Sequence, residues 1–368
     1  MLTHGDDYPI HQTPNPIAYS DSDRNFYDRY FFNAYAPDGS TMFAMAFGVY
    51  PNVNIADAHV AVLLDGRHHC VHASRALDME RMALSVGPIK IEVQEPLRRL
   101  AVTIDESNGI SGQVLFEGRA FPLEEPRFTR RNGPRLLMDF TRLTQNCRVQ
   151  GWLSVDGRRI DLKGWLGTRD RSWGIRSIGT PDPQPMIPPR GSQMFWQWVP
   201  LNFTDRSVFF HVMADGQGVP WNLRSAIVHD GASSTDIIEC HDAGADVELV
   251  PGTRHPGVMR LRVAPPRGAM LRVDMEPIQR FHMRAIGYTS IDWPHGGFKG
   301  ELVTEREDFD ADKTDPRDPT LLHTQTVVRA TLSGHGGDVQ RGIGVFEHLI
   351  RGPYAPLGLS GIADPAPS

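Results

Sequence analysis

Short apolar segments joined by tight turns run through most of the chain. Asp65–Gly66 and Asn108–Gly109 each separate two apolar runs, and segment 89–93 alternates apolar and charged residues. An Asn-Gly or Asp-Gly pair between such runs is the strongest local signal for a β-hairpin. Strict alternation is typical of a strand with one buried face. We therefore predict an all-β protein with many short antiparallel strands and little helix.

The length of 368 residues favours two domains. Residues 181–191 hold five prolines in eleven residues, which excludes a sheet interior and indicates a domain connector. We expect one β domain over 1–180, the connector at 181–191, a second β domain over 192–355 and a disordered tail at 356–368. One segment departs from the strand pattern: Leu136, Leu137, Phe140 and Leu143 recur at helical spacing and predict a short helix or tight turn.

Charge and hydropathy exclude several classes of function. The net charge is −6 and no basic block occurs, so nothing supplies the phosphate neutralisation that nucleic-acid binding requires. No apolar run approaches the roughly 20 residues of a membrane-spanning helix. The polar N-terminus lacks a signal-peptide pattern, and the three cysteines form no disulfide framework. We therefore expect a cytoplasmic protein with reduced thiols, no integral membrane segment and no nucleic-acid partner.

His68, Cys70 and His72 project from one face of a strand, as metal ligands can. No fourth ligand is obvious from the sequence, so we expect no metal. The G-x-S-x-G, Walker A and H-E-x-x-H motifs do not occur.

The densest cluster of ionisable residues lies in segment 165–176. In a strand, Asp170 projects to one face, whereas Arg169, Arg171 and Trp173 project to the other. An Asp in an apolar interior has a raised pKa and can donate a proton, but a nearby arginine lowers that pKa. Two interpretations remain open: an acid or anchor for a substrate hydroxyl group, and a structural ion pair between Asp170 and an arginine.

Three further groups could line a site. Trp196 and Trp198 share one strand face and would wall an apolar cavity or shield a carbocation, unless they only pack in the core. The segment 286–301 supplies an acid–base candidate and two aromatic residues. In segment 344–352, Glu347 and His348 are adjacent and would face opposite sides of a strand. Only one of them can therefore face inward, unless the segment is an exposed edge strand. These candidates are His295 with Tyr288 and Trp293, and Glu347 or His348.

Segment 167–174 resembles a stretch found in the lipocalin-like superfamily of acyclic carotenoid 1,2-hydratase and the AttH-like proteins. That stretch reads Gly-x-x-Asp-His-x-Trp-Gly and here includes Gly167, Asp170, Trp173 and Gly174, with Arg171 in place of the His. The segments around 149–167, 292–301 and 342–349 also look like members of this group. The resemblance implies two lipocalin-like β-barrel or bent-sheet domains packed together, a ligand cavity near their junction, and Asp170 as the proton donor to an alkene.

The leading hypothesis is a hydratase, dehydratase, isomerase or cyclase that acts on a hydrophobic unsaturated molecule, isoprenoid or polycyclic, without a cofactor. Asp170 would donate or relay a proton, and His295 and Glu347 would be the reserve acid–base pair. The rival hypothesis is a non-catalytic carrier or sensor of a hydrophobic ligand. A third, a hydrolase at Asp292 and His295, would need a nucleophile that the sequence does not reveal.

Overall fold

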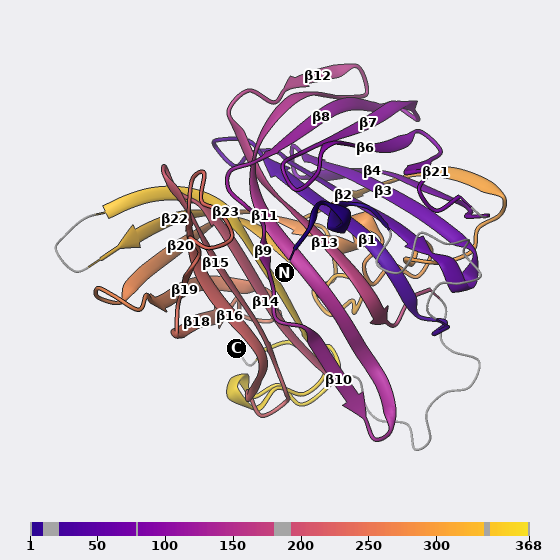
Figure 1. The fold of residues 1–368 in the computed structure, drawn as a ribbon. Helices are drawn as coiled ribbons and strands as arrows, with labels where there is room; N and C mark the ends of the chain where they lie inside the picture. Colours follow the sequence, from indigo (N-terminus) through magenta and orange to yellow (C-terminus); the bar gives the residue numbers. More distant parts are fainter. Residues whose placement is uncertain (1, 10–21, 79, 180–192, 335–338, 367–368) are drawn as a thin grey trace.

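Two antiparallel β-sheets make up the protein. A computed structural model describes residues 2–9, 22–78, 80–179, 193–334 and 339–366. The predicted all-β class is confirmed: one sheet forms a nearly closed barrel and the other a half-barrel (Figure 1). The helical turns among the described residues are the 3-10 turns η1 (His4–Asp7), η3 (Pro51–Val53), η4 (Met283–Ile286) and η5 (Ala355–Leu357).

The first sheet has the strand order β21-β4-β3-β2-β1-β13-β11-β8-β7-β6-β5, with β9, β10 and β12 also paired to β11. Its strands are β1 (Phe26–Tyr35), β2 (Met42–Tyr50), β3 (Ile55–Leu64), β4 (Arg67–Ala76), β5 (Ser85–Val86), β6 (Ile89–Glu95), β7 (Arg99–Ser107), β8 (Ile110–Gly118), β9 (Leu123–Glu124), β10 (Phe128–Asn132), β11 (Arg135–Val155), β12 (Arg158–Asp161), β13 (Trp165–Arg176) and β21 (Leu302–Asp310).

The second sheet has the order β17-β16-β15-β14-β23-β22-β20-β19-β18. Its strands are β14 (Met194–Asn202), β15 (Arg206–Ala214), β16 (Pro220–His229), β17 (Ile238–Glu239), β18 (Asp242–Leu249), β19 (Pro256–Ala264), β20 (Leu271–His282), β22 (Thr324–Ser333) and β23 (Val339–Arg351).

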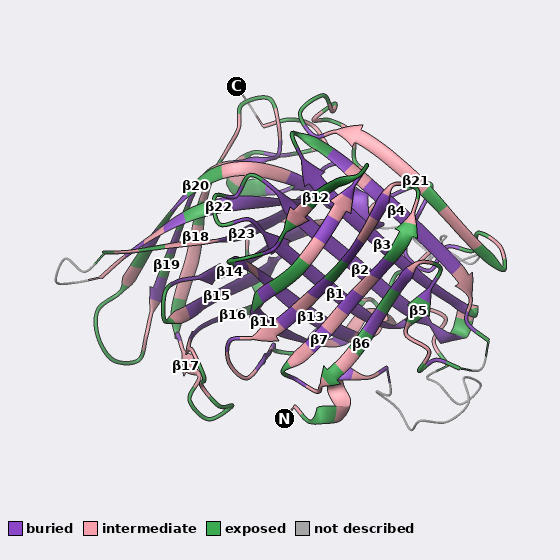
Figure 2. Ribbon diagram, turned by 90° about the horizontal axis from the view of Figure 1, so that it is seen from above, coloured by how far each residue is buried: buried purple, intermediate pink, exposed green. Residues whose placement is uncertain are grey.

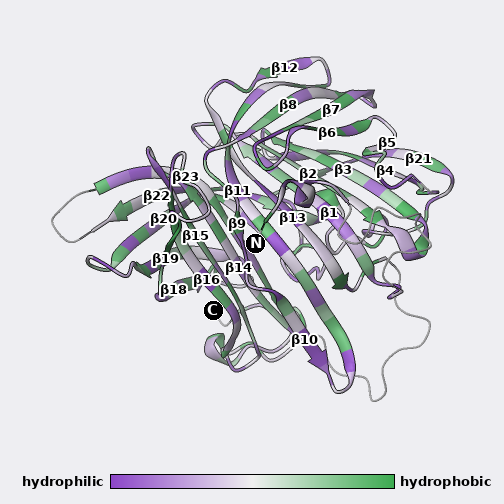
Figure 3. Cartoon of the chain, viewed as in Figure 1, coloured by the Kyte–Doolittle hydropathy of each residue, from purple (hydrophilic) through white to green (hydrophobic). Residues whose placement is uncertain are grey.

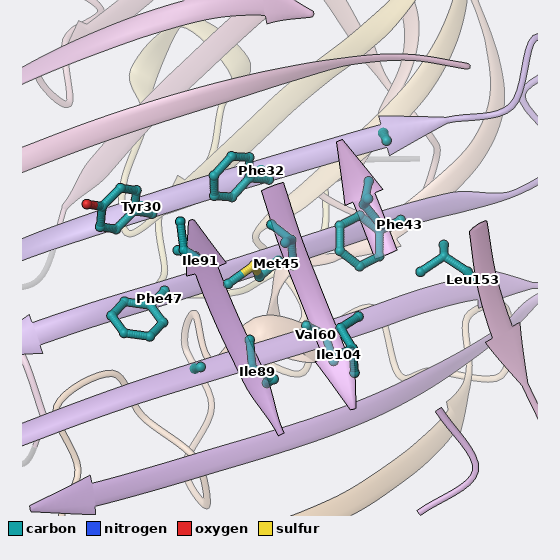
Figure 4. Packing of buried hydrophobic residues seen from close by; sticks show 14 of the residues in the cluster. Tyr30, Phe32, Phe43, Met45, Phe47, Val60, Ile89, Ile91, Ile104 and Leu153 are labelled. Atoms are coloured by element: carbon teal, nitrogen blue, oxygen red, sulfur yellow. The ribbon is translucent and has the colours of Figure 1, made fainter. Parts of the chain in front are cut away.

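Four clusters of buried apolar residues occur among the described residues, and the three largest form the cores of the fold. The first fills the barrel, where the side chains of Tyr30, Phe32, Phe43 and Ile91 pack against one another (Figure 4). The second lies between the two sheets, and the third lines the inner face of the half-barrel. β1 and β14 are buried along nearly their whole length, whereas β6, β12 and β21 at the periphery are partly exposed (Figure 2). The strands where the sheets meet are therefore buried on both faces.

The helix or turn predicted near Leu136–Leu143 is wrong. These residues belong to β11, a strand of 21 residues that pairs with β10 and β8 on one side and β13 on the other. Hydrophilic and hydrophobic residues both occur along it (Figure 3), and Leu136, Leu137 and Met138 form an unbroken apolar run. The helical spacing of Leu136, Leu137, Phe140 and Leu143 is outweighed here because pairing on both edges satisfies the backbone of the strand.

Strand β21 crosses from one half of the chain to the other. Residues 302–310 lie in the predicted second domain, yet they pair with β4 at the edge of the first sheet, as the orange strand beside indigo strands shows (Figure 1). The chain leaves the second sheet after β20 and returns to it at β22. The first sheet is therefore completed by a strand from the second half of the sequence.

The predicted connector at 181–191 lies outside the described residues. Residues 356–366, in the predicted tail, make defined contacts: Leu359 is buried, and Asp364 forms an ion pair with Arg254 at 2.8 Å. No helix in the described part of the chain is long and apolar enough to cross a bilayer. The cytoplasmic location stays a prediction.

A candidate active site between the two sheets

Strand β13 presents opposite chemistry on its two faces. Asp170 lies directly across from Phe31 of β1 and Thr144 of β11, so the three side chains share the face turned toward the second sheet. Arg169 and Arg171 project to the other face, into the barrel. Trp173, farther along the same strand, is only partly buried. The predicted division of this segment into two faces is thus present in the structure.

Both arginines are buried in ion pairs inside the first barrel. Arg169 forms an ion pair with Asp7 of η1 at 2.5 Å, and Arg171 pairs with Asp28 and stacks 3.9 Å from the ring centre of Tyr30. Because these guanidinium groups are committed to other carboxylates, neither one neutralises Asp170.

The carboxyl group of Asp170 is the least compensated acid of this region. It makes no hydrogen bond or ion pair with the described residues. Only 9% of the residue's surface is accessible to solvent. The pKa of Asp170 is raised to about 7. Burial is the largest cause, Arg142 partly offsets it, and nearby Glu125 and Glu347 add to the rise. Asp170 is therefore a buried acid that can hold a proton near neutral pH.

Arg142 and Glu125 form a buried ion pair beside it. Arg142 Nη2 lies 2.5 Å from Glu125 Oε2, and Thr144 donates a hydrogen bond of 2.6 Å to Glu125 Oε1. Burial alone would raise the pKa of Glu125, but Arg142, His211 and Thr144 hold it below its ordinary value. Glu125 therefore stays ionised next to Asp170, and its negative charge favours the protonated form of that group.

The predicted tryptophans lie on β14 and face the first sheet. The guanidinium of Arg142 sits 4.6 Å from the ring centre of Trp196 and 5.5 Å from that of Trp198. Trp198 also makes an edge-on contact with Phe31, with ring centres 6.1 Å apart. Arg142 thus covers one face of Trp196. The two tryptophans therefore contact the charged cluster as well as the apolar core.

Glu347 faces the same interface, and it is the second predicted carboxylate to do so. Trp196 Nε1 donates to it at 2.6 Å, Gln325 Nε2 donates at 2.6 Å, and His323 Nε2 lies 2.8 Å away. Burial favours a higher pKa, but the contacts with His323, Gln325 and Trp196 lower the pKa of Glu347 overall. Glu347 is therefore an ionised carboxylate oriented by three donors.

His348 points the opposite way, into the core of the half-barrel. Neither ring nitrogen has a hydrogen-bond partner among the described residues, and burial lowers its pKa to about 3. It packs near Phe195 and Phe346. The structure thus separates the predicted alternatives: Glu347 faces the sheet interface and His348 does not.

His295 does not pair with Glu347. It belongs to a separate cluster with Asp57 and His59, and the ring of Tyr288 lies between, 4.6 Å from His295 and 5.2 Å from His323. Burial lowers the pKa of His295 well below its ordinary value. Trp293 stacks on His72 in the same cluster. Of this predicted group, Tyr288 alone touches a member of the Asp170 and Glu347 cluster.

Comparison with known proteins places the chain in a family by its sequence. A family of unknown function, DUF8625, matches residues 2–360. The chain belongs to this DUF8625 family. No curated protein matches it.

The DUF8625 chain resembles solved structures in its fold. A structure of CghA with Sch210972 has 13% identity and a TM-score of 0.51, and covers 89% of each chain. A structure of CghA alone has 12% identity and a TM-score of 0.50, and covers 89% of this chain and 88% of the other. A protein from Nitrosomonas europaea assigned as AttH has 13% identity and a TM-score of 0.49, over 88% and 92% of the chains. At identities this low, the comparisons establish similarity of fold alone.

Sequence reasoning missed several members of this DUF8625 site. Arg142 lies in the segment interpreted as a helix, so its strand face could not be assigned. Glu125 directly follows β9, a strand of two residues. A strand this short has no alternation pattern that could identify it in the sequence. His323 and Gln325 are two positions apart around the start of β22 and so share one strand face, which is the one signal that could have identified them.

Two surface hollows lie elsewhere on the described part of the molecule. One of about 550 Å³ is lined by charged residues of β18–β20, and one of about 350 Å³ lies near Arg206 and Leu332; both are on the second sheet. At the sheet interface, Met138, Met194 and Trp221 are partly exposed and pack against the shared core. We call these three residues, which belong to the partly buried hydrophobic residues around that core, the apolar rim.

Proposed function

We propose that this protein is a cofactor-independent enzyme that transfers protons to and from a hydrophobic, unsaturated substrate bound between the two sheets. The observation that carries the proposal is Asp170, a buried carboxyl group with a pKa of about 7, beside two carboxylates held ionised. When the environments of two carboxyl groups push their pKa values apart, the group with the higher pKa can act as the acid and the ionised group as the base.

Asp170 would act as the general acid. Its proton would add to one alkene carbon and leave a carbocation at the other, and the carboxylate so formed would be balanced by Arg142. In a hydratase, water adds to the cation and its surplus proton passes to a base. In an isomerase or cyclase, an adjacent carbon loses the proton instead. Glu347 is the base we propose, because it is ionised and lies at the same interface, where Trp196, Gln325 and His323 orient its carboxylate.

The apolar rim at Met138, Met194 and Trp221 would admit the hydrocarbon part of the substrate. Isoprenoid and polycyclic alkenes fit such a rim, since they offer no charged group for recognition. The similarity in fold to CghA, solved in complex with Sch210972, supports a small-molecule ligand in this fold.

The test combines a native extract with deuterium labelling. Apolar molecules that co-purify with the protein, and acyclic carotenoids as defined probes, are incubated with the enzyme in D₂O and analysed by mass spectrometry. Proton addition by Asp170 predicts deuterium on carbon in the product. Asp170→Asn should lower the rate by roughly 10²–10⁴, whereas Asp105→Asn, on the exposed part of β7, should not.

The carrier hypothesis makes the opposite prediction. If the co-purified molecule is recovered chemically unchanged and without deuterium, the protein is a carrier or sensor. Full turnover by Asp170→Asn on a confirmed substrate would remove Asp170 from the mechanism.

A further inference from the structure

A second buried cluster lies where the chain crosses between the sheets. The loop between η4 and β21 places His295 against Asp57 and His59 of β3. One ligand atom from each residue lies within 4.8 Å of the other two, and all three residues are buried. His59 Nε2 is 3.6 Å from Asp57 Oδ2, and His295 Nδ1 is 3.8 Å from Asp57 Oδ1.

The contacts around His59 are consistent with an Nε2 that carries no proton. His59 Nδ1 lies 2.9 Å from His72 Nδ1, and His72 Nε2 makes an ion-pair contact of 3.5 Å with Glu307 Oε2 that is not a hydrogen bond. In the tautomer that places His72 Nε2–H toward this carboxylate, His72 Nδ1 accepts from His59 Nδ1–H. His59 Nε2 then has a bare lone pair beside the Asp57 carboxylate, and two acceptors that face each other repel unless a cation lies between them.

The other nitrogens of the cluster are also unsatisfied. His59 Nε2 and both ring nitrogens of His295 are buried without a hydrogen-bond partner among the described residues. Buried polar groups normally have partners. Gly287 keeps the neighbouring space clear, because a Cβ there would lie 3.0 Å from His59 Nε2 and 3.0 Å from His295 Cε1.

The Asp57 carboxylate is held by a second layer of contacts. Gly296 N–H donates to its Oδ2 at 2.6 Å, and the Tyr50 hydroxyl lies 3.2 Å from its Oδ1. The chain from His59 through His72 to Glu307 orients the imidazole in the same way. Such outer partners, which fix the tautomer of a histidine and the rotation of a carboxylate, are typical of protein metal sites.

We propose that Asp57, His59 and His295 bind a divalent transition metal ion, with Zn²⁺ as the best match. Tetrahedral zinc with ligand bonds of about 2.0–2.1 Å separates its ligand atoms by about 3.3 Å. The His59–Asp57 and His295–Asp57 separations of 3.6 and 3.8 Å are a few tenths of an ångström longer than this, and the three ligand atoms all lie within 4.8 Å of one another. Two imidazoles and a carboxylate are a donor set that zinc accepts, with a fourth position left for water.

The position in the fold indicates what the metal does. His295 belongs to the crossing segment between β20 and β21, whereas Asp57 and His59 belong to the first sheet. The ion would therefore fasten the crossing segment to that sheet and hold Tyr288, which touches both His295 and His323, in place. This role is independent of the proposed proton transfer.

The experiment measures metal binding directly. The full-length protein is stripped with a chelator and titrated with Zn²⁺, and separately with Co²⁺, whose visible absorption reports its ligands. We expect one ion per chain, a melting temperature that rises with Zn²⁺ concentration, and slower hydrogen exchange in residues 287–297. His72→Gln should weaken binding by about 10–100-fold, the usual effect of losing an outer partner.

His59→Gln and His295→Gln should each abolish the Zn²⁺-dependent rise in melting temperature. His255→Gln, at a buried histidine outside the cluster with an unpartnered Nδ1, is the matched control and should keep the rise. If the two ligand variants do not fold, the Co²⁺ spectrum of the unaltered protein still decides, since histidine and carboxylate ligation has a distinct absorption. Absence of saturable binding, or binding that survives loss of both histidines, would overturn the proposal.

Discussion

Asp170 and Arg171 are neighbours in the sequence but occupy opposite faces of β13. Arg171 is paired with Asp28 inside the barrel, and Asp170 faces the second sheet without a partner among the described residues. An arginine next to an aspartate in the sequence suggests that the two charges neutralise each other. In a strand, adjacent side chains point to opposite faces, so Arg171 cannot reach Asp170. The pKa of Asp170 is raised to about 7, mainly by burial.

Replacing Asp170 should change stability in a pH-dependent way. The pKa of Asp170 is about 7 in the folded protein against 3.8 ordinarily, so between these values the folded chain holds a proton that the unfolded chain has lost. The free energy of unfolding therefore falls as pH rises from about 4 to 7, by about 1.4 kcal/mol for every pH step of one in that interval.

Asp170→Asn does not titrate, so it should be more stable than the unaltered protein by a few kcal/mol at about pH 8, with the advantage disappearing near pH 4. Urea unfolding at a series of pH values measures this, with Asp105→Asn as the control. A difference between the two proteins that does not vary with pH would contradict the raised pKa.

Glu347→Gln should lower the pKa of Asp170, because it removes a nearby negative charge while keeping the size of the side chain. Because Glu347 is also the proposed base, activity cannot report this shift, and the pH dependence of unfolding is used instead. We expect the fall in the free energy of unfolding with pH to end at a pH lower by on the order of one unit. Urea unfolding at a series of pH values measures this change; an unchanged profile would exclude electrostatic coupling between the two carboxyl groups.

Arg142→Met should destabilise the protein by about 3–5 kcal/mol, since it leaves Glu125 buried and uncompensated. The double variant Arg142→Met with Glu125→Gln removes both charges and should recover much of the loss. A double-mutant cycle from urea unfolding gives the coupling free energy. Additive effects would show that the two charges do not interact.

Gly287→Ala tests the close approach above His59. Gly287 has φ +89°, and a Cβ there would lie 3.0 Å from His59 Nε2. A left-handed backbone costs a non-glycine residue about 1–2 kcal/mol, and the contact with His59 adds to that cost. Gly231→Ala is the matched control, with φ +74° and nothing within 4 Å of the added carbon. Equal losses of melting temperature in the two variants would exclude the contact.

The fold class could be predicted because turns and alternation are local signals. The pairing of β21 with β4 could not, since it joins residues more than two hundred positions apart in sequence and nothing local specifies the partner edge. The same holds for the site. Asp170 is a candidate from its segment alone, and Glu347 only as an alternative to His348, whereas Glu125 and His323 become relevant only through the packing of one sheet on the other.

The crossing strand also determines where the polypeptide could be divided. A fragment that ends near residue 180 would lack β21 and leave β4 with an open edge of unsatisfied backbone groups, a surface that favours aggregation. The complementary fragment would carry β21 with no sheet to join. Each half therefore needs the other to fold. If the gene is split at the proline-rich segment, soluble protein should form only when both fragments are produced together.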